Sequence, residues 1–114
     1  MSEFGELLKE LRKEHRISQR KLADMVGIDF TYISKIESGT MVPPAEDKII
    51  KIAEIFNVDS DKLLIAANKI PADFQKVITE IEDVPVFLRS ASKFSQTQWK
   101  EIKRIIDETK DNEE

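Results

Sequence analysis

Cysteine is absent from the 114 residues, and histidine occurs once, at His15. Without cysteine the chain cannot form disulfides, thiolate metal sites or a cysteine nucleophile. A single histidine leaves no Ser-His-Asp triad and no histidine-rich metal cluster. The carboxylates have no accompanying base or nucleophile. We therefore expect no enzyme, no metal site and no cofactor.

Long apolar runs and clustered glycines are missing as well. No stretch approaches the roughly 20 apolar residues that span a bilayer, and residues 1–16 lack the apolar core of a signal peptide. The three glycines are scattered, so they form no glycine-rich phosphate loop. We expect a cytoplasmic protein of about one domain's size.

The charge is unevenly distributed. The net charge of −4 argues at first against a nucleic-acid partner. Between Lys9 and Lys21, however, six basic residues accompany only two acidic ones, Glu10 and Glu14. A locally basic surface on an acidic chain remains compatible with double-stranded DNA.

Apolar residues recur at helical spacing and no alternating strand pattern occurs, which predicts an all-α fold. Ser18 and Asp29 are typical N-caps, while Gly27 and Gly39 are suited to ending the helices before them. Pro44 suits the first turn of the fourth helix. The five helices expected in the first 67 residues cover about residues 4–15, 19–26, 30–38, 44–56 and 60–66.

The rest of the chain has a looser pattern. A sixth helix is expected to begin near Pro71. Pro85 then interrupts, so residues 84–94 are expected to form an irregular connection with room for one helical turn. Ser95 and Gln98 form a capping box for a last helix. Its acidic end opposes the helix dipole, so residues 111–114 are expected to fray.

Two short helices joined by a glycine-containing turn are the helix-turn-helix signature. Residues 18–28 supply the first helix, with small Ala23 at the helix crossing and Gly27 at the turn, and residues 32–39 supply the second. On these residues the chain resembles the Cro/C1-type, or XRE, family of prokaryotic and phage repressors over residues 4–67. The resemblance implies a five-helix, lambda-repressor-like DNA-binding domain in residues 1–67.

The second helix of this motif has two different sides. At about 100° per residue, Ile33 and Ile36 mark the side that faces the core. Thr31, Lys35 and their polar neighbours point away from it. A short helix with a polar free face fits the major groove of B-DNA, where a lysine can donate to guanine O6 or N7.

The resemblance also implies roles for single residues. The base-reading positions match Phe30, Thr31, Ser34 and Lys35. The phosphate-contacting positions match Gln19, Ser38 and Thr40. Ser18, Arg20 and Tyr32 are further candidates for phosphate contacts, and the alternative for Arg20 is that it only makes the surface soluble. Relatives commonly carry a polar residue at the position of Phe30, which favours a contact with thymine methyls here. The alternative is that Phe30 and Tyr32 only flank the core.

Arg12 and Glu37 match a pair that in relatives bridges the first helix to the end of the recognition helix. A guanidinium and a carboxylate can form a planar, two-point ion pair. We assign this pair to structure rather than to direct phosphate contact.

Residues 68–114 are the candidate dimerisation segment, with two or three helices and a frayed acidic tail. One helix-turn-helix unit covers only roughly 600–1,000 Å², so a two-fold dimer over two half-sites is the usual solution. The segment carries more apolar surface than 47 residues can bury, and the alternative is an intrachain cap on the first domain. The dimerisation residues expected are Phe74, Ile78, Ile81, Leu88, Trp99, Ile102 and Ile106.

The function expected is therefore that of a homodimeric repressor on a palindromic operator. The alternative is an antitoxin or an adaptor whose C-terminal helices bind a different protein. The layout also resembles repressors that a partner zinc metalloprotease cuts near the C-terminus. On that resemblance the bond between Leu88 and Arg89 is a candidate target, and otherwise residues 84–90 form a packed turn.

Overall fold

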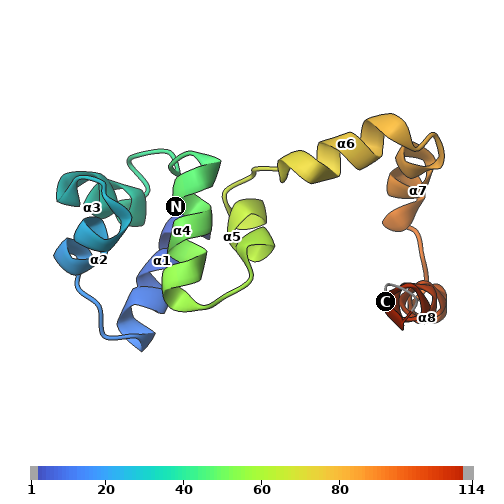
Figure 1. Cartoon of the computed structure of the whole chain (residues 1–114), viewed down its shortest axis with the longest axis horizontal. Coiled ribbons are helices and arrows are strands. Elements are labelled where there is room, and N and C mark those ends of the chain that lie inside the picture. The colour runs from blue at the N-terminus through green and yellow to red at the C-terminus, as the bar shows by residue number, and fades with distance from the viewer. Residues whose placement is uncertain (1–2, 112–114) are drawn as a thin grey trace. The chain divides into compact units, whose positions relative to one another are not determined.

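The computed structural model describes residues 3–111, which form eight α-helices and no strand (Figure 1). The all-α expectation is confirmed. The helices are α1 (Glu3–Glu14), α2 (Gln19–Val26), α3 (Phe30–Ser38), α4 (Glu46–Phe56), α5 (Ser60–Ala66), α6 (Ala72–Glu80), α7 (Asp83–Ala91) and α8 (Gln96–Asp111). The chain divides into two compact units, the first ending at Ala72 and the second beginning at Asp73.

The first unit is built around one hydrophobic core that receives side chains from α1 to α5. Burying each large apolar side chain contributes roughly 1.5–3 kcal/mol. The fully buried side chains include Phe4, Leu8, Leu22, Val26, Ile33, Ile36, Ile49, Ile52, Phe56, Leu63 and Leu64. This core fixes α3 from its inner side.

Helix α1 approaches the backbone of α3 closely at Gly5. A Cβ atom at this position would lie 2.3 Å from the carbonyl oxygen of Ile36, closer than real Cβ contacts come. The hydrogen side chain of Gly5 is therefore what allows α1 and α3 to pass each other at this distance.

Helix α4 begins later than the sequence predicts. Pro44 was expected in its first turn, but Ala45 is extended and is the N-cap, without a side-chain hydrogen bond. The first turn instead contains Glu46 and Asp47. Carboxylates are favourable at the positive end of the helix dipole, so the helix begins where they lie.

The expected irregular connection of residues 84–94 is wrong, because most of it forms α7. Pro85 lies in the first turn of α7, where its missing N–H has no intrahelical acceptor to lose. The capping box of α8 is present: the Gln98 amide donates to Ser95 Oγ at 3.1 Å, and the Ser95 amide donates to Gln98 Oε1 at 2.9 Å. Asp111, expected to fray, is the last residue of α8, and residues 112–114 lie outside the described range.

The second unit lacks a core of its own over residues 73–110, because none of these residues is buried. Helices α6 and α7 line an open apolar hollow of about 320 Å³. Phe87 of α7 meets Phe94 and Trp99 in an aromatic cluster, with ring centroids 5.4–6.3 Å apart. The hollow is lined by Phe74, Val77, Ile78, Val84 and Leu88.

Candidate nucleic-acid interface

Helices α2 and α3 are neighbours joined by a tight turn at Gly27 (Figure 1). Gly27 is left-handed, with φ 82°, and its N–H donates to the Ala23 carbonyl at 2.8 Å. A left-handed residue at this position is what lets the chain reverse without a Cβ clash. Asp29 then caps α3 by accepting from the Thr31 amide at 3.4 Å. The local sequence thus sets both the turn and the first residue of α3.

Helix α3 presents an apolar side and a polar side. Ile33 and Ile36 are completely buried, with 0% exposure. Thr31 and Lys35 are exposed, as is Ser38 at the end of the helix, while Ser34 is half-buried. The inward and outward sides predicted from the helical spacing are those that the structure has.

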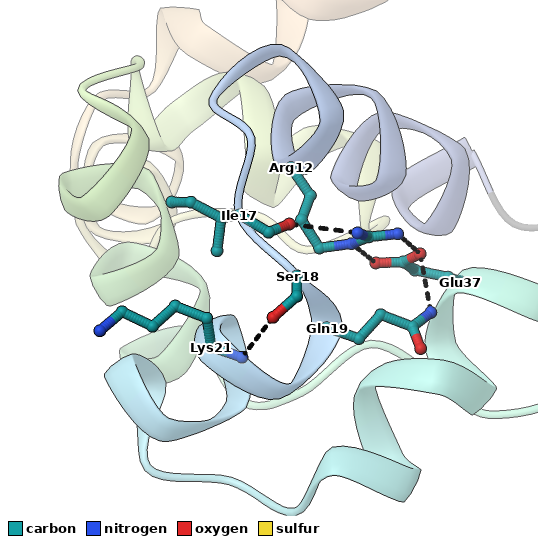
Figure 2. Close-up of polar contacts among 6 residues, drawn as sticks. All are labelled: Arg12, Ile17, Ser18, Gln19, Lys21 and Glu37. Carbon is teal, nitrogen blue, oxygen red and sulfur yellow. Dashed lines mark hydrogen bonds and ion pairs between the residues drawn. The ribbon is translucent and has the colours of Figure 1, made fainter.

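A polar network fixes the C-terminal half of α3 to α1 and α2 (Figure 2). The Arg12 guanidinium donates from Nε to Glu37 Oε2 at 2.8 Å and from Nη2 to Glu37 Oε1 at 2.9 Å. Its Nη1 donates to the Ile17 carbonyl at 3.1 Å. Gln19 Nε2 donates to Glu37 Oε1 at 3.1 Å. The Glu37 carboxylate on α3 therefore binds both α1, through Arg12, and α2, through Gln19.

The Arg12–Glu37 pair is largely withdrawn from solvent, with side-chain exposures of 13% and 4%. The hydrogen bond that Arg12 donates to Glu37, together with the negative charge of Glu37, raises the pKa of Arg12 above its ordinary value, against a smaller lowering by burial. Arg12 therefore keeps its positive charge beside Glu37. The expected ion pair between Arg12 and Glu37 is present, and Gln19 donates a further hydrogen bond to its carboxylate.

Ser18 acts as the N-cap of α2, because its Oγ accepts from the Lys21 amide at 3.0 Å (Figure 2). Its hydroxyl proton has no acceptor among the described residues, so it can be donated to an external oxygen. Gln19 keeps a second amide N–H beyond the one that Glu37 receives. Ser18 and Gln19 thus each make one hydrogen bond within the protein and keep one donor group that can bind a phosphate oxygen.

Three other predicted phosphate contacts have hydroxyls that already bind the protein. Tyr32 donates to the Val42 carbonyl at 3.2 Å, which fastens the α3–α4 loop to α3. Ser38 Oγ and Thr40 Oγ1 lie 3.0 Å apart. Each of these hydroxyls can donate to the Lys35 carbonyl, at 3.1 Å from Ser38 and 3.3 Å from Thr40. A hydroxyl has one proton, so a phosphate contact there requires an internal hydrogen bond to be exchanged.

Arg20 lies over the ring of Phe30, with its Cζ 4.3 Å from the ring centroid. Phe30 is half-buried and packs against the core with part of its surface. Whether Phe30 contacts thymine methyls or only flanks the core, the Arg20 guanidinium lies over its ring. The sequence shows no signal for this contact, since the two residues lie on different helices whose crossing angle the helical spacing does not give.

The predicted dimerisation residues lie in the second unit and none of them is buried. Phe74, Ile78 and Leu88 line the hollow, and Trp99 belongs to the aromatic cluster. The others, Ile81, Ile102 and Ile106, remain at least partly exposed. Leu88 and Arg89, the candidate cleavage site, lie inside α7 rather than in a loop.

Two further features concern metals and membranes. Within residues 3–111, no group of three or more histidine, aspartate or glutamate side chains is placed to hold a metal ion. None of the helices in that range combines the length and the apolar character that crossing a bilayer requires.

Comparison with known proteins identifies the first unit. A family model described as a helix-turn-helix domain matches residues 5–69. An uncharacterised HTH-type transcriptional regulator of Bacillus subtilis, RghRB, is 37% identical over 83 residues, which are 73% of this chain and 59% of that protein. The HTH-type transcriptional repressor RghR of the same organism is 34% identical over 70 residues, or 61% of this chain and 52% of that protein. The chain thus spans little more than half of their length.

Two more matches agree with these. The ImmF control region 10 kDa protein of Bacillus phage phi105 is 35% identical over 60 residues, which are 53% of this chain and 66% of that protein. Among solved structures, a chain of the SinR protein/SinI protein complex is similar in fold, with a TM-score of 0.51 and 24% identity. The similarity covers 95% of this chain and 98% of the other.

Proposed function

The chain belongs to the helix-turn-helix domain family, of the Cro/C1 (XRE) type, and on that premise we propose that it is a transcriptional repressor that binds a palindromic operator as a homodimer. Repression needs no chemistry, because occupying an operator that overlaps a promoter excludes the polymerase. The protein would act in the cytoplasm, where the DNA is.

The observation that carries this proposal is the polar side of α3. Thr31 and Lys35 are exposed on a helix whose opposite side is buried and whose end is fixed by the Arg12–Glu37 pair. A rigid helix that leaves donors and acceptors free is suited to reading base edges in the major groove. The free donors of Ser18 and Gln19 at the start of α2 support phosphate contacts beside it.

The homodimer is supported by the second unit. None of its residues 73–110 is buried in the single chain, although large apolar side chains such as Phe74, Leu88 and Trp99 occur there. Leaving such surface in water is unfavourable by about 25 cal/mol per Å². A second copy of the same unit would cover it and would join two copies of α3 in one molecule.

The test is in vitro selection of duplexes from a random pool with the full chain, followed by light scattering of the free protein. We expect an enriched sequence with two inverted half-sites whose centres are about one helical turn, or a multiple of it, apart. We expect the free chain to have twice the monomer mass. Recovery of unenriched sequences, with no duplex retained at low ionic strength, would contradict DNA binding, and a monomeric chain would contradict the dimer.

A second candidate is a protein-binding regulator, an antitoxin or adaptor, in which the second unit takes a different partner. The similar fold was solved in a complex of two proteins, and the apolar hollow between α6 and α7 could receive an apolar segment. Copurification of a second protein in equal amount from the native host would favour this candidate. A stable homodimer that binds no such protein would favour the repressor.

We also propose that a metalloprotease partner cleaves the chain between Leu88 and Arg89 as a means of regulation. Leu88 is 51% exposed, but the bond lies within α7, so this helix must unwind before a protease can bind it in an extended form. Unchanged turnover in cells of a chain carrying an Arg89→Asp substitution, under conditions that induce degradation, would contradict it.

A further inference from the structure

Arg20 is directed across to α3 rather than along its own helix. Asp24 lies four residues further on, the spacing at which an ion pair commonly forms on a helix. Among the described residues, however, no carboxylate lies within ion-pair distance of Arg20. Its guanidinium instead lies 4.3 Å above the ring of Phe30, the first residue of α3.

The ring is a firm support for this guanidinium. Phe30 packs against the core, so its position is set by the same packing that fixes α3. A guanidinium over an aromatic face is attracted to the ring, while its N–H groups remain able to donate to another acceptor. The guanidinium of Arg20 has no hydrogen-bond acceptor among the described residues. The Arg20 guanidinium is therefore held in place with its N–H groups free to bind an acceptor outside the described residues.

We propose that Phe30 is a positioning residue, which holds Arg20 as a preorganised contact for a DNA phosphate at the edge of the groove that α3 enters. This inference rests on the proposed DNA-binding function and adds a role for Phe30 other than a contact with thymine methyls. Holding a long side chain in advance reduces the conformational entropy that is lost when the phosphate binds. The Arg20 guanidinium would donate to a phosphate diester of the DNA backbone, so this contact does not depend on the base sequence.

The test measures binding of the full chain to a mixed-sequence duplex of about two helical turns, over a series of salt concentrations. Replacing Arg20 by Ala is expected to lower the salt slope by about 0.9, the value of one phosphate contact. Phe30→Leu changes no charge, yet it should lower the slope as well and weaken binding about two- to fivefold, as for the loss of a cation–π contact. Phe30→Tyr, which keeps the ring, should restore both.

A double variant separates positioning from an independent contact. Arg20→Ala with Phe30→Leu should bind no more weakly than Arg20→Ala alone. Additive losses, or a wild-type salt slope in Phe30→Leu, would overturn the inference. So would a change of base preference at thymine positions without a change of slope, since that result assigns Phe30 to direct contact.

Arg20→Lys makes the test independent of how well Phe30 variants fold. Lysine keeps the charge but not the planar stack, so we expect weaker binding than in the wild type despite an equal net charge. Binding and slope equal to those of the wild type would overturn the inference. If the wild-type chain itself retains no duplex at low ionic strength, the proposed function fails, which is a different outcome from a missing Arg20–Phe30 coupling.

Discussion

Arg12 and Glu37, 25 residues apart in the sequence, form a two-point ion pair that joins α1 to the end of α3. The pair is mostly buried, and Gln19 adds a third hydrogen bond to the same carboxylate. Helix α3 is therefore held by a charge on α1 as well as by the apolar core. A buried pair of this kind has little net value but is costly to break on one side only.

Arg12→Ala is expected to destabilise the first unit by about 3 kcal/mol, because it leaves the Glu37 carboxylate buried without its counter-charge. Urea unfolding followed by circular dichroism measures the change. The control is Arg104→Ala on α8, where the guanidinium binds two carboxylates, Glu101 and Glu108, and more than half of each side chain is exposed to solvent. We expect no measurable change there, since exposed ion pairs contribute little. Equal effects of both substitutions would contradict the importance of burial.

The pH dependence of this pair has a definite sign. Glu37 raises the pKa of Arg12, so the stabilisation from Arg12 is fully present below the ordinary arginine pKa and is lost only as the pH rises through the raised value. The difference in unfolding free energy between wild type and Arg12→Met should therefore stay constant from neutral pH to moderately alkaline pH. A decline of that difference over this range would show that Arg12 titrates earlier than its hydrogen bonds imply.

Gly5→Ala is expected to destabilise the chain, although alanine normally stabilises a helix interior by up to about 1 kcal/mol relative to glycine. The new Cβ would meet the Ile36 carbonyl oxygen at 2.3 Å, so α1 or α3 must shift. We expect a net loss of about 1–3 kcal/mol, as for other overpacking substitutions, measured by urea unfolding. A gain in stability would mean that the two helices separate easily, and then α3 is held less firmly than we infer.

Lys35→Ala is expected to relax base preference, while Gln19→Ala weakens binding to all sequences. Lys35 is exposed on α3 and can donate to a base, and losing such a contact removes about 1–3 kcal/mol of discrimination. Gln19 lies at the start of α2, where its free N–H can reach a phosphate. Binding of each variant to a selected duplex and to a random duplex measures both terms. Equal losses on the two duplexes for Lys35→Ala would refute this division of roles.

Local signals in the sequence predict most of the first unit, because its helix ends depend on single residues. Gly27 and Gly39 are both left-handed with φ 82°, and Ser18 and Asp29 both accept a cap hydrogen bond. The same kind of reasoning failed at Pro85, because proline stops a helix in its interior but starts one in its first turn. Sequence periodicity does not distinguish these two positions.

The contacts that the sequence did not reveal are tertiary. Tyr32 donates to the Val42 carbonyl, and the Arg20 guanidinium lies over the Phe30 ring, across two elements in each case. Helical spacing assigns each residue to a side of its own helix, but it gives neither the angle between helices nor the path of a loop. The Arg12–Glu37 pair was found only because the resemblance to a known family supplied that information.

Leu88→Glu is expected to convert a dimeric chain into a monomer. Leu88 lines the apolar hollow of the second unit, where a carboxylate buried by a second copy would lack a partner. Light scattering at several protein concentrations measures the mass. Because a dimer binds two half-sites at once, the affinity for a palindromic duplex should fall, while the affinity for a single half-site stays the same.

The matched control is Val42→Glu, which places the same charge on an apolar residue of the first unit that is already 74% exposed. It should leave the mass unchanged. The thermal unfolding of both variants should remain close to that of the wild type, because neither side chain belongs to the core around α3. A Leu88→Glu chain that remains a dimer would place the contact between copies away from the hollow, on the aromatic cluster or on α8.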